Sequence, residues 1–150
     1  MKKFRFKFSA ILNLRKTREE EALRALGAAQ RVYQAALADK ARLLADLEAA
    51  LIRRENLGKD AIDILPFQLE EEFINGTKHR IVHAERCIVR ASRGVEKALR
   101  VYLHARRQTR MMETLYDKNH AEFRKAEGKR EQKMMDDLSI MRERLKERFA

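Results

Sequence analysis

The stretch that decides the fold covers residues 74–105 and reads INGTKHRIVHAERCIVRASRGVEKALRVYLHA. Its apolar and small residues return at steps of three and four, or of seven: Ile74, Ile81, Ala84, Ile88, Ala91, Val95, Ala98, Tyr102 and Ala105. Apolar residues that recur every 3.5 positions keep one seam of a helix facing a partner helix. The stretch therefore predicts one helix of a coiled coil.

The same spacing continues outward from this stretch in both directions. It reaches Met112, Tyr116, Phe123 and Ala126, and it recurs earlier at Phe8, Leu12, Ala22, Leu26, Ala29, Tyr33, Ala36, Leu43, Leu47, Ala50 and Leu57. We predict an all-α fold, a long antiparallel two-helix coiled coil with helices over about residues 9–57 and 67–148. The whole of residues 1–150 forms one such hairpin.

Ser9 is the expected N-cap of the first helix. Gly58 and Pro66 bracket the expected tip loop, about residues 58–66, because Gly suits a helix C-cap and the residue before Pro disfavours the helical region. Three apolar residues of the loop are expected to close the end of the seam: Ile62, Ile64 and Leu65.

Several seam positions are not apolar, namely Arg15, Glu19, Lys40 and Arg54 in the first helix and Thr77, Thr109 and Asn119 in the second. Two interpretations of Lys40 and Arg54 are open. They fix the register and antiparallel orientation at a cost in stability, or their long stems lie along the seam while their charges reach water.

The spacing changes after Ala126. Positions 126, 130, 134 and 138 follow in steps of four, a stutter that locally unwinds a supercoil, and the next apolar stripe is Met134, Leu138, Met141, Leu145 and Phe149. The second helix outlasts the first, so about residues 118–150 form an overhang. We predict that this stripe binds a partner; the alternative is self-association of two overhangs.

Phe4, Phe6 and Phe8 alternate with basic residues before the first helix. An edge strand would show this alternation. We favour instead a flexible or helical arm whose aromatic side chains pack on the overhanging helix or on a partner.

Basic charge points to an anionic partner. The net charge is +11, and residues 78–110 contain ten Lys or Arg against two acids. One basic stripe falls opposite the seam, at Arg86, Arg90, Arg93, Lys97, Arg100, His104 and Arg107. An acidic protein surface and a nucleic acid both fit such a stripe. The absence of aromatics within it argues against stacking on single strands.

The sequence contains no recognisable catalytic or metal-binding motif. It has no phosphate-binding Gly loop, nucleophile elbow or zinc-ligand cluster, and His79 and His83 lack a third ligand at metal spacing. The single Cys87 forms no internal disulfide and is expected to be an inert, half-buried thiol. We expect a cytoplasmic protein that is no enzyme, spans no membrane and needs no metal or cofactor.

Both ends of the chain resemble the FliJ family, the small basic coiled-coil proteins of bacterial flagellar type III export. The N-terminal likeness rests on Phe6-Lys7-Phe8, Leu12-Asn-Leu14-Arg15-Lys16 and Glu19-Glu-Glu-Ala22. The C-terminal likeness rests on Lys129-Arg-Glu-Gln-Lys-Met-Met-Asp-Asp137, and Phe73-Ile74 followed by Ile81 matches a third element. The likeness in length and layout covers essentially the whole chain.

The resemblance implies a rod similar to the central stalk of rotary ATPases. Its terminal half would bind the hexameric export ATPase and promote ring assembly, through Arg15, Gln132, Lys133, Met135, Asp136 and Leu138. The hairpin would contact the membrane export gate protein through Leu43 and Phe73 and hand over empty export chaperones. Most neighbouring gate-contact positions of the family are Ala, Thr, Arg or Asp here. A virulence-type secretion stalk and a nucleic-acid-binding coiled coil are the alternatives.

Overall fold

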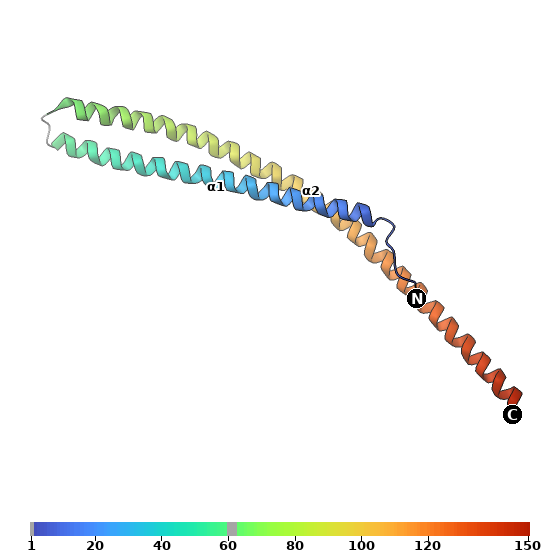
Figure 1. Cartoon of the computed structure of the whole chain (residues 1–150). Coiled ribbons are helices and arrows are strands. Elements are labelled where there is room, and N and C mark those ends of the chain that lie inside the picture. Colours follow the sequence, from blue (N-terminus) through green and yellow to red (C-terminus); the bar gives the residue numbers. More distant parts are fainter. Residues whose placement is uncertain (1, 60–62) are drawn as a thin grey trace. The chain divides into compact units, whose positions relative to one another are not determined.

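The computed structural model describes residues 2–59 and 63–150, and two helices account for nearly all of them (Figure 1). Helix α1 spans Ser9–Lys59 and helix α2 spans Ile64–Phe149. No strand occurs in the described part of the chain. The predicted all-α fold, with two long helices packed against each other, is confirmed.

The chain forms two compact units, one from Glu20 to His104 and one from the residues up to Glu19 together with those from Ala105. In the first unit, the cyan end of α1 runs antiparallel beside the green and yellow part of α2 (Figure 1). In the second unit, the start of α1 lies against α2 around Thr109. Each unit is therefore held by the packing of one helix segment on another.

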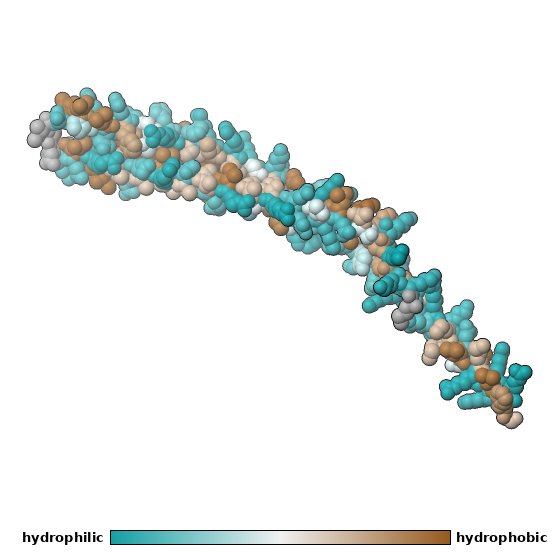
Figure 2. All heavy atoms as spheres, in the orientation of Figure 1, coloured by the Kyte–Doolittle hydropathy of each residue, from teal (hydrophilic) through white to brown (hydrophobic). Residues whose placement is uncertain are grey.

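The predicted seam holds the unit of residues 20–104 together. Every seam residue of α1 from Ala22 to Leu57 is buried or half-buried, and Gly27 is the one other residue of that stretch that is not exposed. Hydrophilic side chains cover much of the visible surface around the seam (Figure 2). The most buried apolar side chains of this unit are Ala22, Leu26, Ala50, Ile74, Ile81 and Ala84.

Lys40 and Arg54 combine the two interpretations that the sequence left open. Both residues are half-buried, so their stems lie along the seam, and their charged ends reach Glu residues of α2. Lys40 Nζ lies 3.4 Å from Glu85 Oε1, and Arg54 Nη1 lies 2.6 Å from Glu71 Oε1. In both pairs the residue numbers add up to the same value, as one antiparallel register requires. Partly exposed pairs contribute at most about 1 kcal/mol each, so they set register more than stability.

The helix ends near the turn differ from the prediction. Helix α1 continues through Gly58 to Lys59, and no described glycine has the positive φ of a C-cap. Helix α2 starts at Ile64, so Pro66 lies inside its first turn, where a missing backbone N–H costs no hydrogen bond. Ile64 and Leu65 are exposed and do not close the seam, and Ile62 lies outside the described residues.

The first turn of α1 corrects the expected N-cap. The amide of Leu12 donates to the carbonyl oxygen of Phe8 at 2.9 Å, which makes this the first helical hydrogen bond. The residue whose carbonyl accepts that bond is the N-cap. Phe8 therefore occupies the capping position and Ser9 is the first helical residue.

Thr109 links the two helices in the unit that contains the chain ends. Its side chain is 2% exposed, and its hydroxyl lies 3.1 Å from the carbonyl oxygens of both Arg15 in α1 and Ala105 in α2. A Thr at a seam position is tolerated here because its polar atom has partners. Thr77 is buried too, and its hydroxyl bonds the Phe73 carbonyl of its own helix at 2.7 Å.

The variant Thr109→Val is expected to lower the free energy of unfolding by about 1 kcal/mol, because one interhelical hydrogen bond is lost at nearly constant volume. Chemical denaturation followed by circular dichroism measures the change. Thr77→Val is the matched control, since it removes only a bond within α2. A loss at Thr77 larger than that at Thr109 would contradict a bridging role for Thr109.

Candidate partner-binding surfaces

The C-terminal part of α2 carries the apolar stripe with no cover from the described chain. From Gly128 to Phe149 every side chain is exposed, and Met135 is 63% and Phe149 83% exposed. We call this set the C-terminal stripe: Met134, Met135, Leu138, Met141, Leu145 and Phe149. A row of large apolar side chains in water is typical of a surface that a partner covers, and Met is common on adaptable surfaces.

Most residues expected to bind the ATPase fall within two turns of this segment. They are Gln132, Lys133, Met135, Asp136 and Leu138, all of them exposed. Arg15 lies elsewhere, because it is half-buried and its carbonyl oxygen accepts the hydroxyl of Thr109. From Thr109 to Gln132 is about 35 Å along α2 at 1.5 Å per residue. The structure therefore does not bring Arg15 together with the others.

The N-terminal arm covers the part of α2 just before the bare segment. The Phe4 ring centroid lies 5.5 Å from that of Tyr116, 5.0 Å from His120 and 5.4 Å from Phe123. Phe6 is buried and lies 5.2 Å from Tyr116. The expected packing of the arm on the second helix is confirmed. Residues 2–8 form neither a strand nor a helix.

The last part of α2 that other residues cover is the part packed against the N-terminal arm. Phe123 is half-buried under Phe4, whereas Ala126, the last residue of the predicted seam, is exposed. The 4-3 spacing therefore continues past the last covered seam residue, into the segment where we expect no partner helix. Neither the arm nor α1 supplies a side chain opposite Ala126.

The variant Phe4→Ala is expected to increase amide hydrogen exchange of residues 116–123, because three aromatic contacts of about 0.5–1.5 kcal/mol each are lost. Hydrogen exchange with mass spectrometry measures the protection of this stretch. Peptides from residues 130–150 should exchange alike in both proteins, since no arm residue covers them. Unchanged protection at residues 116–123 would show that the arm does not stabilise α2.

The two residues expected to face the export gate lie apart. Leu43 is half-buried and lines a groove between the helices with Asp39, Arg80, His83 and Cys87, among others. Phe73 is 37% exposed, and the guanidinium carbon of Arg53 lies 5.8 Å from its ring centroid. Leu43 is thus reached through a groove and Phe73 directly from solvent.

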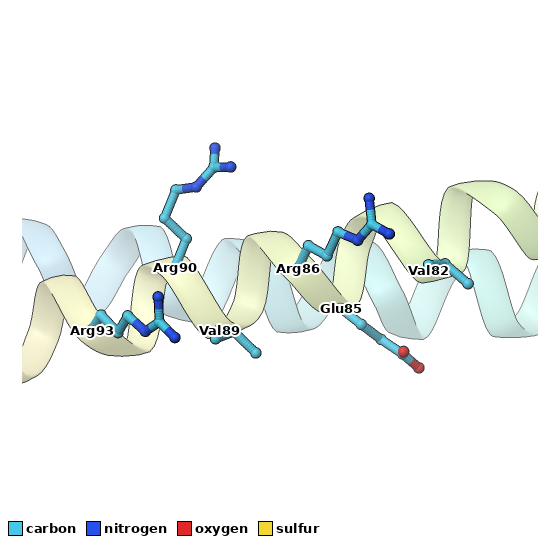
Figure 3. Close-up of a pocket in the computed structure, with 6 residues that line it drawn as sticks. All are labelled: Val82, Glu85, Arg86, Val89, Arg90 and Arg93. Carbon is cyan, nitrogen blue, oxygen red and sulfur yellow. The ribbon is translucent and has the colours of Figure 1, made fainter.

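The basic stripe is exposed along α2, as its pattern indicates. Arg86, Arg90 and Arg93 line a shallow groove with Val82, Glu85 and Val89, and Figure 3 shows Arg86 and Arg90 extending away from the side that carries Glu85 and Val89. Lys97, Arg100 and His104 continue the row, and Arg107 belongs to the other unit. The two acids within residues 78–110, Glu85 and Glu96, both have basic partners. Lys40 pairs with Glu85, and Arg100 Nη2 lies 3.8 Å from Glu96 Oε2. Arg100 is thus partly neutralised by Glu96, whereas no ion pair within the described residues joins Arg86, Arg90 or Arg93 to an acid.

Neither a metal site nor a membrane span is found in the part of the chain that the structure describes. No group of three or more His, Cys, Asp or Glu is placed to hold a metal ion there. His83 Nε2 lies 3.7 Å from Sγ of the half-buried Cys87, and two such residues are too few to hold a metal ion. No helix within residues 2–59 and 63–150 combines the length and the hydropathy needed to cross a bilayer.

Comparison with known proteins gives one match. The family model of the flagellar FliJ protein matches residues 4–148. No curated protein and no solved structure matches the chain. The matched range includes the three Phe residues of the arm, all of α1, and α2 up to Arg148, and so all of the C-terminal stripe except Phe149. The chain therefore belongs to the flagellar FliJ protein family, whose members are components of the flagellar protein export apparatus.

Proposed function

We propose that this protein is the stalk of a flagellar export ATPase: it binds the hexameric ATPase through the C-terminal stripe and promotes assembly of the ring. The observation that carries the proposal is the exposure of Met134, Met135, Leu138, Met141, Leu145 and Phe149 on one bare helix. A single helix with an apolar stripe fits into a groove or ring on a partner. Arg15 lies in α1 against Thr109, which is about 35 Å before Gln132 along α2, so Arg15 would act at a second contact.

We propose that the hairpin of residues 20–104 couples the ATPase to the membrane export gate protein. The groove that contains Leu43 and the exposed ring of Phe73 are its candidate contacts. Gly94 and several Ala residues line the neighbouring groove between the helices, which leaves room for a partner segment. Escort of empty export chaperones belongs to the same proposal, as does a location on the cytoplasmic face of the inner membrane at the flagellar base.

Two other functions are the alternatives to this proposal. A virulence-type secretion stalk would share the coiled coil, but the family match is to a flagellar protein. A nucleic-acid-binding coiled coil would use the basic stripe, led by Arg86, Arg90 and Arg93, and would bind duplex or RNA with a steep dependence on salt. That function gives no role to the C-terminal stripe.

A pull-down from a lysate of flagellated cells tests the proposal. The full-length chain and a chain ending at Ala126 serve as baits, and mass spectrometry identifies what they retain. We expect an export ATPase with the full-length chain and none with the shorter one. Circular dichroism should show the same unfolding temperature for both, because the removed side chains are almost all exposed. Recovery of nucleic acid without an ATPase would overturn the proposal.

A further inference from the structure

A second apolar surface lies on one flank of the hairpin, beside the seam. It is centred on the ion pair between Lys40 and Glu85. Leu37 and Leu44 lie one helical turn before and after Lys40, and Val82 and Val89 lie likewise around Glu85. Residues three or four apart share one face of a helix. The four apolar side chains therefore surround the ion pair, and we call these four the flank surface.

The side chains of the flank surface are exposed, because other residues form the seam between the two helices. Leu37, Leu44, Val82 and Val89 are between 36% and 52% exposed. Leu51 extends the surface along α1, one turn before Arg54 and its pair with Glu71. Single exposed apolar residues are ordinary, but a contiguous group contributed by two helices marks a contact site.

A basic border follows the flank surface along α2. Arg86, Arg90 and Arg93 line the same groove as Val82 and Val89; Arg93 extends toward Val89, and Arg86 and Arg90 extend from the other edge of the groove (Figure 3). Glu85 is the one acid of that groove, and Lys40 pairs with it. An approaching carboxylate would therefore meet arginines and no unpaired acid.

We propose that the flank surface binds an acidic amphipathic helix of a partner protein. Apolar residues at 3.5 spacing on that helix pack on the Leu and Val side chains, and its Asp or Glu residues pair with Arg86 and Arg93. Charge complementarity favours this occupant. A second copy of the chain is disfavoured, because each copy carries a net charge of +11 and the same row of arginines.

This interaction goes beyond the stalk function proposed above. The groove that Leu43 lines shares no residue with the flank surface, and the C-terminal stripe lies outside residues 20–104. The flank surface therefore consists of residues other than those of the candidate ATPase and gate contacts. The two proposals fail or succeed independently.

The test is a fluorescence anisotropy titration of a labelled synthetic helix against the full-length chain. The probe has about four heptads with Leu at the seam positions and Glu beside them; a matched probe carries Gln in place of Glu. We expect the Glu probe to bind, and the pair Arg86→Glu with Arg93→Glu to weaken binding at least about tenfold. The pair Leu44→Asp with Val89→Asp should weaken it as much.

Matched variants control for charge and for general apolar contact. The pair Lys118→Glu with Arg124→Glu makes the same charge change elsewhere, and Val32→Asp alters an exposed apolar residue in the grooves between the helices. Both control variants are expected to bind the Glu probe as the wild type does. Retention of export ATPase by the Leu44→Asp and Val89→Asp chain separates this interaction from the stalk function.

Several results would overturn the proposal. If the Gln probe binds as tightly as the Glu probe, charge plays no role in binding. If Val32→Asp weakens binding of the Glu probe as much as Leu44→Asp with Val89→Asp does, the probe does not bind at the flank surface. Phosphatidylglycerol vesicles or duplex DNA binding through Arg86 and Arg93, with no binding of the Glu probe, would assign the surface to another ligand. Sedimentation that shows self-association, lost in Leu44→Asp, would make a second copy the occupant.

Discussion

Replacing Met135 and Leu138 together by Asp is expected to weaken stimulation of the export ATPase at least about a hundredfold. Both side chains lie in the C-terminal stripe and are more than half exposed, so the changes remove apolar contact with a partner without disturbing a core. Burying a large apolar side chain contributes about 1.5–3 kcal/mol, and a buried unpaired carboxylate costs more. We therefore expect half-maximal stimulation to need at least about a hundredfold more of the variant.

Met111→Asp is the matched control for this experiment. Met111 is 65% exposed, as Met135 is to within a few per cent, and it lies in α2 before the bare segment. The control variant should stimulate the ATPase as the wild type does. Full stimulation by the Met135→Asp and Leu138→Asp chain would remove the C-terminal stripe from the mechanism.

The largest effect on stability is expected from Ile74→Ala. Ile74 is 1% exposed, and Ala50, which the register of the ion pairs places close to it in the seam, is fully buried. Such a truncation deletes buried methyl groups and leaves a cavity, at a cost of about 2–4 kcal/mol. For a chain of this size the unfolding temperature should fall by roughly 5–15 °C. Thermal unfolding followed by circular dichroism measures the shift.

Ile52→Ala provides the comparison within the same unit. Ile52 is 53% exposed, so its truncation should change the free energy of unfolding by less than about 1 kcal/mol. Equal losses for Ile52 and Ile74 would mean that the seam is not what holds the helices together. A large loss for Ile74 alone supports the seam.

The sequence predicts the seam well because a coiled coil is governed by local spacing. Steps of three and four place Ala22, Leu26, Ile74 and Ile81 on facing stripes, and those residues are buried. The charged seam residues were ambiguous for a physical reason. Whether Lys40 forms an ion pair depends on the residue opposite it in the other helix. Glu85 takes that position only in the register that the two helices adopt.

The helix ends were predicted less well. Gly and Pro have strong local preferences, but Pro66 satisfies its preference inside the first turn of α2 as readily as before it. Gly58 stays helical because the neighbouring turns of α1 continue the hydrogen-bonded ladder. Such choices differ by about 1 kcal/mol, which is too little for a sequence pattern to resolve.

The candidate surfaces were predictable in part. The break in spacing after Ala126 indicated the C-terminal stripe, and the alternating Phe residues indicated the arm. The flank surface was missed, because Leu37 and Leu44 look like scattered surface residues until Val82 and Val89 of the other helix lie beside them. The separation of Arg15 from Met135 also depends on which residue of α2 faces α1, here Thr109.

Site-specific photo-crosslinking to purified export ATPase tests the central claim most directly. A photoreactive residue is placed in the full-length chain at Met135, in the C-terminal stripe, or at Val32, in the hairpin. The account predicts crosslinks to the ATPase from position 135 and none from position 32. Crosslinks from position 32 with none from position 135 would contradict it.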